Sequence, residues 1–134
     1  MGLEELKGSG SILVMDDEEQ LRNLLKLILE ELGYRPSFSA NGAECIAQYT
    51  SAISRGEKYD LVLMDLAIAG GMGGKETMAE LLKLDPKVQA VVSSGNSLDP
   101  VMMDCKNFGF SGTLSKPYML KELAAELKRL IPSK

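Results

Sequence analysis

Five side chains able to bind metal or phosphate, or to act as a nucleophile, stand at the ends of apolar runs: Asp16, Asp17, Asp65, Ser94 and Lys116. Three carboxylates brought together repel one another and resist loss of water unless a cation joins them. Oxygen ligands suit a hard cation, and Mg²⁺ is the first candidate in a cell. A carboxylate can also attack a phosphoryl group, whose charge Mg²⁺, an ammonium and a hydroxyl would neutralise. These residue types therefore predict Mg²⁺-dependent phosphoryl chemistry.

Histidine is absent from the 134 residues, and this excludes several kinds of site. There can be no Ser-His-Asp or Cys-His nucleophile, no histidine ligand for zinc and no phosphohistidine.

A net charge of −4 argues against a nucleic-acid partner, which usually requires a basic patch. The apolar stretches are short and interrupted by charge, so we expect no membrane contact and a cytoplasmic location. In that reducing compartment Cys45 and Cys105 are expected to be unpaired, small apolar residues.

The hydrophobic pattern predicts five strand–helix units in one domain. The expected strands are residues 11–15, 34–39, 61–64, 88–92 and 112–115. The expected helices lie between Asp17, as N-cap, and Gly33, then over about residues 43–54, 75–84, 97–107 and 119–131. This alternation predicts an α/β fold, a doubly wound five-stranded parallel sheet with five helices on its two faces. Half of a Rossmann domain is the second interpretation, but an acidic pair replaces the Gly-rich phosphate loop after the first strand.

The carboxyl ends of parallel strands meet at one edge of an open α/β sheet, where binding sites lie. If the first and third strands are neighbours, the three aspartates meet at this edge. Simpler interpretations stay open for each residue. Asp16 and Asp17 could cap the first helix, Asp65 could be a loop residue, and Lys116 could be a solvated lysine at the sheet edge. A register error of one residue would exchange Ser94 with Ser93.

Four segments resemble the receiver domain of two-component response regulators and hybrid sensor kinases. They are ILVMDDEEQLRNLL, DLVLMDL, AVVSSG and SKP, which begin at residues 12, 60, 90 and 115. The resemblance covers residues 11–131 and implies a flavodoxin-like sheet with strand order 2-1-3-4-5. Residues 1–10 are then a linker or disordered tail, and residues 132–134 a C-terminal tail. Residues 64–76 most resemble receivers attached to bacterial hybrid histidine kinases.

The resemblance implies a role for each site residue. Asp65 would be the phosphoacceptor, and Asp16 and Asp17 the acidic pair that binds Mg²⁺ together with Asp65. The backbone carbonyl of Ala67 would complete the protein ligands of the metal. Ser94 would be the switch hydroxyl, and Lys116 would bind a phosphoryl oxygen.

The implied function is that of a phosphoacceptor module and not of a metabolic enzyme. A histidine kinase or a histidine phosphotransfer domain would donate its phosphoryl group to Asp65, and the module would promote its own phosphorylation and dephosphorylation. Phosphorylation would reshape the surface of the fourth helix, fifth strand and fifth helix, a surface that is also compatible with a weak homodimer.

The sequence departs from the usual receiver at three positions. Thr113 stands where many receivers carry an aromatic switch residue, so a rotamer signal from an aromatic ring is not expected. Ala69 replaces the usual proline, in a glycine-rich loop that is one residue longer than the common form and is expected to be more mobile. Ala67 offers no side chain to the site.

Two rival functions remain. A Mg²⁺-dependent phosphohydrolase also uses an aspartate nucleophile, but usually carries Asp-x-Asp after its first strand and a cap insertion, both missing here. A pseudo-receiver would only bind partners and would have an incomplete site, whereas every expected position is filled. No output domain follows Ile131, so we expect either a stand-alone receiver or a fragment of a hybrid kinase, and residues 64–76 favour the fragment.

Overall fold

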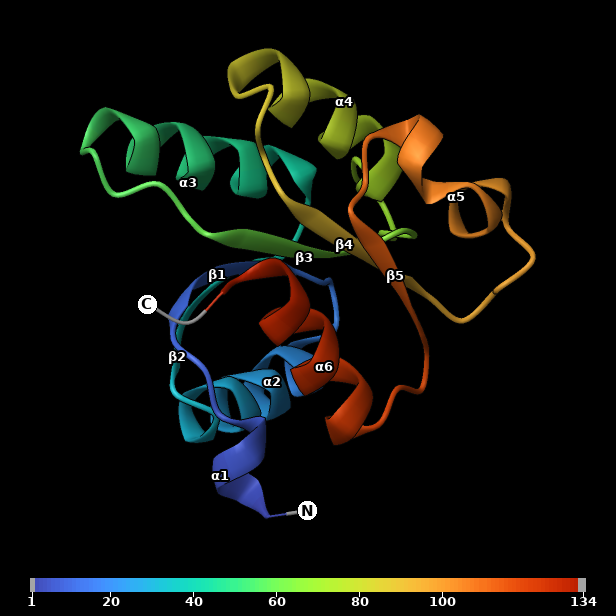
Figure 1. Ribbon diagram of the computed structural model, residues 1–134. Coiled ribbons are helices and arrows are strands. Elements are labelled where there is room, and N and C mark those ends of the chain that lie inside the picture. Colours follow the sequence, from blue (N-terminus) through green and yellow to red (C-terminus); the bar gives the residue numbers. More distant parts are fainter. Residues whose placement is uncertain (1, 133–134) are drawn as a thin grey trace.

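The computed structural model describes residues 2–132 and contains one five-stranded parallel sheet (Figure 1). The strand order is β2-β1-β3-β4-β5, as the receiver resemblance implied, and each neighbouring pair is parallel, as the alternation of strands and helices predicted. The strands are β1 (Gly10–Met15), β2 (Tyr34–Ser39), β3 (Leu61–Asp65), β4 (Ala90–Ser94) and β5 (Gly112–Ser115). All five residues of β3 and of β4 are buried, because these central strands are covered on both faces.

Helices cover both faces of the sheet. They are α1 (Leu3–Leu6), α2 (Glu19–Glu31), α3 (Gly42–Ser54), α4 (Gly74–Leu84), α5 (Pro100–Met103), the 3₁₀ helix η1 (Cys105–Phe108) and α6 (Leu120–Leu130). Figure 1 shows α2 and α6 on one face, and α3, α4 and α5 on the other. Alternate residues of β1 enter the two cores, so Ile12 packs with the α2 and α6 side and Leu13 with the opposite side. No helix in the described part of the chain is long and apolar enough to cross a membrane.

The fourth strand–helix unit differs most from the prediction. Strand β4 covers Ala90–Ser94, two residues later than expected, so Ser94 lies within the strand. The single helix expected over residues 97–107 is instead the short α5 followed by η1. Asp99 caps α5 by accepting the Val101 N–H at 2.9 Å, and Pro100 occupies the first turn. The helix thus begins at Pro100 and not at residue 97, where the predicted helix began.

The N-terminal segment contains a helical turn where we expected a linker or disordered tail. The backbone N–H of Gly8 donates to the Leu32 carbonyl at 2.9 Å, and Lys128 Nζ donates to the Glu5 carbonyl at 2.9 Å. Leu6 also packs against the core cluster on the α2 and α6 face. These contacts connect the segment to α2 and α6, and its role as a linker stays a prediction. Of the expected C-terminal tail, residues 133–134 lie outside the described residues.

A buried tyrosine connects α3 to the end of α4. The hydroxyl of Tyr49, on α3, donates to Asp85 at 2.7 Å, and Lys58 forms an ion pair with the same carboxylate at 2.6 Å. Burial would raise the pKa of Asp85, but the hydrogen bonds from Lys58, Tyr49 and the Lys87 amide outweigh it and lower the pKa.

Tyr49→Phe is expected to lower the free energy of unfolding by about 1.5–3 kcal/mol, the range for a hydrogen bond to a charged group. Because the folded-state pKa of Asp85 is lowered, the stability from its ionised form is present at neutral pH. It is lost as the pH falls through that lowered value, so the difference between variant and wild type should shrink in acid. Urea denaturation at several pH values measures both effects. Tyr59→Phe is the matched control, because no hydrogen bond from the Tyr59 hydroxyl occurs within residues 2–132, and an equal loss there would refute the assignment.

Candidate phosphoryl-acceptor site

The predicted site residues gather at the carboxyl ends of the central strands. Asp16 follows β1 directly, and Asp65 is the last residue of β3, paired in register with Ser93 of β4. The side chains of Asp16 and Asp65 are 4% and 10% exposed respectively, so both are largely removed from bulk water. Neighbouring positions of β1 and β3 in the strand order explain why Asp16 and Asp65 meet, as the sequence predicted.

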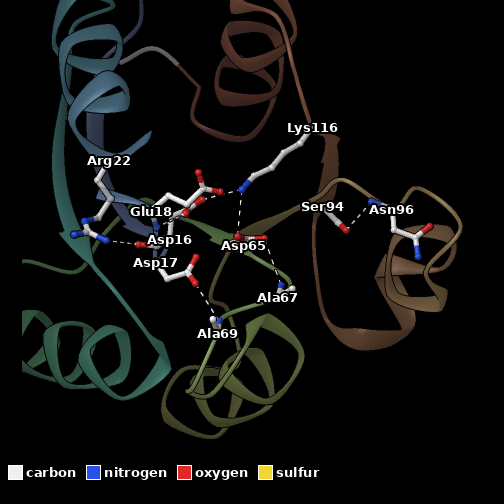
Figure 2. Close-up of polar contacts among 10 residues, drawn as sticks. All are labelled: Asp16, Asp17, Glu18, Arg22, Asp65, Ala67, Ala69, Ser94, Asn96 and Lys116. Atoms are coloured by element: carbon white, nitrogen blue, oxygen red, sulfur yellow. Dashed lines mark hydrogen bonds and ion pairs between the residues drawn. The ribbon is translucent and has the colours of Figure 1, made fainter. Parts of the chain in front are cut away.

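Lys116 joins two of the three aspartates. Its Nζ lies 2.9 Å from Asp16 Oδ2 and 3.2 Å from Asp65 Oδ2, as Figure 2 shows. The lysine follows β5, where its backbone N–H donates to the carbonyl of Ser94 at 2.8 Å. The next peptide bond, Lys116–Pro117, is cis. These contacts rule out the interpretation of Lys116 as a solvated lysine at the sheet edge.

Burial and charge act on the pKa of both partners. Burial raises the pKa of Asp65, and the Lys116 ammonium only partly opposes this shift. Burial would lower the pKa of Lys116, but the hydrogen bond and charge of Asp16, followed by those of Asp65, raise it above the usual value. Lys116 is therefore held as a cation beside the acceptor candidate.

The acidic pair after β1 is oriented by backbone N–H groups. Asp16 Oδ1 accepts the Glu18 N–H at 3.0 Å, whereas Asp17 Oδ2 accepts the Ala69 N–H at 3.0 Å, from the loop that follows β3. The expectation that Asp17 is the N-cap of the first helix is wrong. Glu18 occupies that position without a side-chain cap, because the Asp17 carboxylate is directed to the loop.

The three aspartates fit a hard cation. Asp16, Asp17 and Asp65 each offer a carboxylate oxygen, and these oxygens lie within 4.8 Å of one another. Lys116 contributes one positive charge against three negative charges, so two negative charges remain uncompensated within this group. A small divalent cation with oxygen ligands would supply the missing charge.

Ser94 lies beside the aspartates, on a cavity between the β3–α4 and β4–α5 loops. Its Oγ accepts the Asn96 N–H at 3.0 Å, a bond that Figure 2 shows. The cavity has a volume of about 520 Å³ and is lined by Ala67 and Ser94 as well as by Lys75. Ser93, the alternative, is 2% exposed and does not line this cavity.

Ala67 and Thr113, the remaining two predicted positions, have no side-chain hydrogen bond at the site. The Ala67 N–H donates to Asp65 Oδ1 at 3.3 Å, and the role of the Ala67 carbonyl as a metal ligand stays a prediction. Thr113 is half-buried in β5, where it pairs with Val92, and forms no side-chain hydrogen bond to the site.

Sequence reasoning missed several residues that surround the site. Arg22 Nη1 donates to the Asp16 carbonyl at 2.7 Å, which ties α2 to the end of β1. Tyr118 is half-buried two residues after Lys116, and burial raises its pKa to about 12. Tyr118 also lines, with Lys116 and Glu18, a groove of about 460 Å³ along α2. A tyrosine so close to the lysine was a visible signal, whereas Arg22 looked like any solvated helical arginine.

Comparison with known sequences decides the family. The sequence model of the family described as response regulator receiver domain matches residues 12–128. The chain belongs to this family. It is a phosphoacceptor domain of two-component signal transduction, whose acidic cluster fits a phosphorylation site.

Relatives of this receiver domain include both short and long proteins. The sporulation initiation phosphotransferase F of Bacillus subtilis is 27% identical over 123 residues, which cover 92% of this chain and 94% of the relative. The sensor kinase CckA of Brucella abortus is 28% identical over 127 residues, 95% of this chain but 13% of the kinase. The chain spans half the length of a further relative, the uncharacterized transcriptional regulatory protein YkoG of Bacillus subtilis, at 29% identity.

Solved structures of similar fold include two that are described with bound magnesium. The response regulator TrrA of Thermotoga maritima, in complex with Mg²⁺ and BeF, is 29% identical with a TM-score of 0.78, and the match covers 90% of this chain and 98% of that one. The receiver domain of the sensor histidine kinase PA1611 of Pseudomonas aeruginosa, with magnesium in its active-site cleft, has a TM-score of 0.79 at 24% identity. That match covers 94% of this chain and 100% of the other.

Proposed function

We propose that this receiver domain accepts a phosphoryl group from a phosphohistidine donor onto Asp65. The observation that carries the proposal is the position of the Asp65 carboxylate at the end of β3. It contacts the Lys116 ammonium at 3.2 Å and shares a cluster with two further aspartates. A nucleophile, a fixed cation and a set of metal ligands are the parts that phosphoryl transfer requires.

In the proposed transfer an oxygen of Asp65 attacks the phosphorus atom of the donor. The P–O bond to Asp65 forms as the P–N bond to the donor imidazole breaks, and the bond electrons and a proton from solvent go to the leaving imidazole. Lys116 stabilises the negative charge of the phosphoryl oxygens, and Ser94 donates a hydrogen bond to one of them. Hydrolysis of the acyl phosphate by water later regenerates the carboxylate and releases phosphate, so the domain takes part in both its phosphorylation and its dephosphorylation.

Asp16, Asp17 and Asp65 would hold Mg²⁺, with the Ala67 carbonyl as a fourth protein ligand. When bound, the ion would neutralise part of the negative charge that the phosphoryl group brings to the cluster. Two observations support this assignment: the clustered carboxylate oxygens, and the magnesium named with the TrrA and PA1611 structures.

The proposed donor is the phosphohistidine of a kinase or phosphotransfer domain in the cytoplasm. These 134 residues contain no histidine, so a phosphohistidine donor must belong to another protein or domain. The relatedness to CckA and to the kinase mak1 of Schizosaccharomyces pombe supports a histidine kinase as this source. We propose that the signal then leaves through the surface of α5, β5 and α6, because Ser94 and Lys116 adjoin those elements.

Acetyl phosphate and Mg²⁺, followed by intact mass measurement, test the proposal. We expect a gain of one phosphoryl group in wild type, and no gain after addition of a chelator. No gain in wild type, together with no response to beryllofluoride, would favour the pseudo-receiver. Multiple-turnover hydrolysis of an external phosphomonoester would instead favour the phosphohydrolase.

Ser94→Ala is expected to leave Asp65 open to phosphorylation but to remove most of the accompanying conformational change. The reason is that the nucleophile and Lys116 stay in place, whereas the hydroxyl that would be attracted to the phosphoryl group is gone. Amide chemical shifts of β5 and α6, recorded with and without beryllofluoride, measure the change. Ser93→Ala is the matched control for loss of a neighbouring hydroxyl. If Ser94→Ala responds like wild type, Ser94 is not the switch.

A further inference from the structure

The loop after β3 contacts the proposed metal site through two backbone groups: the Ala67 N–H donates to Asp65, and the Ala69 N–H donates to Asp17. The Ala69 N–H donates to Asp17 Oδ2 at 3.0 Å, across 52 positions of sequence. Figure 2 shows one oxygen of the Asp17 carboxylate directed at Ala69 and the other directed away from it. Lys116 contacts Asp16 and Asp65 but forms no ion pair with Asp17. The Ala69 amide is therefore the group that orients this third carboxylate.

Other contacts hold the loop in a position where Ala69 can donate. The Gly42 N–H, at the start of α3, donates to the Met72 carbonyl at 3.1 Å, and the Gly74 N–H donates to the Leu66 carbonyl at 3.0 Å. A Cβ atom on Gly73 would lie 2.5 Å from the Leu66 carbonyl oxygen, so the close return of the loop requires glycine there. Three hydrogen bonds thus define the position of the loop, and its greater mobility stays a prediction.

The residue type at position 69 decides whether this hydrogen bond exists. A proline at this position would have no N–H and could not donate. Gly70 follows with φ of 70°, which corresponds to the third position of a type II turn, where proline is common at the second. The shape of the turn would therefore also allow proline at position 69. Alanine differs from proline in having a backbone N–H that can donate to Asp17.

We propose that the Ala69 amide is a positioning group for Mg²⁺, one that orients Asp17 as a ligand and couples ion binding to the β3–α4 loop. The inference rests on the proposed function of the aspartate cluster. Groups that hydrogen-bond a metal ligand commonly change metal affinity by about 10–100-fold. Because Ala69 is exposed and Asp17 half-buried, we expect an effect at the lower end of that range.

Ala69→Pro removes the donor while preserving a turn. We expect its Mg²⁺ affinity, measured by isothermal titration calorimetry, to be about tenfold weaker than that of wild type. Ala69→Ser keeps the N–H and is the matched control, with an expected affinity like that of wild type. Urea denaturation in the absence of Mg²⁺ should show that both variants are folded. In wild type, Mg²⁺ should also slow hydrogen exchange of the Ala69 amide, because a bound ion fixes its acceptor.

Each outcome separates this inference from the proposed function. Wild-type binding that Ala69→Pro leaves unchanged would overturn the role of Ala69 and leave the aspartate site intact. The same holds if Ala69→Ser weakens binding as much as Ala69→Pro, since the side chain or loop shape would then be responsible. Absence of Mg²⁺ binding by wild type would overturn both proposals.

Discussion

Asp65→Asn is expected to abolish phosphorylation by acetyl phosphate, with no mass gain under conditions that fully modify wild type. The amide that replaces the carboxylate has the same shape but is far less nucleophilic, and no second aspartate lies in the same relation to Lys116 and Ser94. Asp16 also contacts Lys116, but it follows β1 and is turned toward the backbone of Glu18. Phosphorylation should therefore not be transferred to it.

The same substitution is expected to raise stability. Burial raises the pKa of Asp65, which means that the folded protein holds the proton more tightly than the unfolded chain does. At neutral pH the ionised carboxylate therefore destabilises the fold, and the uncharged Asp65→Asn variant should have a higher free energy of unfolding in metal-free buffer. Urea denaturation measures this difference.

Asp60→Asn is the matched control for both measurements. Asp60 precedes the same strand at its other end, where Oδ2 accepts the Ser11 N–H at 2.9 Å, a bond that an asparagine oxygen can also accept. This variant should be phosphorylated like wild type. Equal loss in the two variants, or a mass gain in Asp65→Asn, would contradict the assignment of Asp65.

Lys116→Met is expected to have two opposite effects, on phosphorylation and on metal binding. Loss of a fixed charge that stabilises transferring oxygens typically slows catalysis by about 100–1,000-fold, so phosphorylation should slow by that order. Mg²⁺ should at the same time bind the variant more tightly. In wild type the Lys116 ammonium contacts Asp16 and Asp65 and repels a second cation, and the substitution removes this repulsion. A unit charge a few ångströms away near a protein surface is worth about 1–4 kcal/mol, which predicts a gain of about tenfold or more.

Rapid quench followed by intact mass measurement gives the rate, and calorimetry gives the affinity. Lys75→Met is the control, because Lys75 lines the neighbouring cavity but contacts the Phe108 ring and not the aspartates. Weaker Mg²⁺ binding by Lys116→Met would show that the lysine supports the metal site instead of competing with it. An unchanged phosphorylation rate would remove Lys116 from the proposed mechanism.

Much of the fold and of the site could be predicted from sequence because both depend on short-range patterns. The apolar runs of β1 and β3 end in aspartates, and the parallel arrangement that brings those ends together follows from strict alternation of strands and helices. Lys116 could be assigned by its place after β5. The structure adds the contacts of Lys116 with Asp16 and Asp65, which no spacing rule contains.

Other features escaped because they depend on long-range contacts or on competition between local signals. The loop N–H of Ala69 that orients Asp17 comes from a residue 52 positions away, so the helix-cap interpretation of Asp17 could not be rejected beforehand. After β4, Ser97 and Asp99 were both able to cap a helix, and Pro100 favours the nearer one. The segment that contains α1 is hydrogen-bonded to Lys128 of α6 and to Leu32 at the end of α2. The sequence of residues 1–10 does not reveal these contacts.

The backbone hydrogen bond between Lys116 and Ser94 has a consequence for how a signal would start. The Lys116 N–H donates to the Ser94 carbonyl and so joins the ends of β5 and β4. These two ends carry the side chains that we expect to contact the phosphoryl group. Movement of either end toward a phosphoryl group should carry the other with it. We therefore expect the two contacts to form cooperatively, so that intermediates with one contact are rare and the domain responds to phosphorylation in an all-or-none manner.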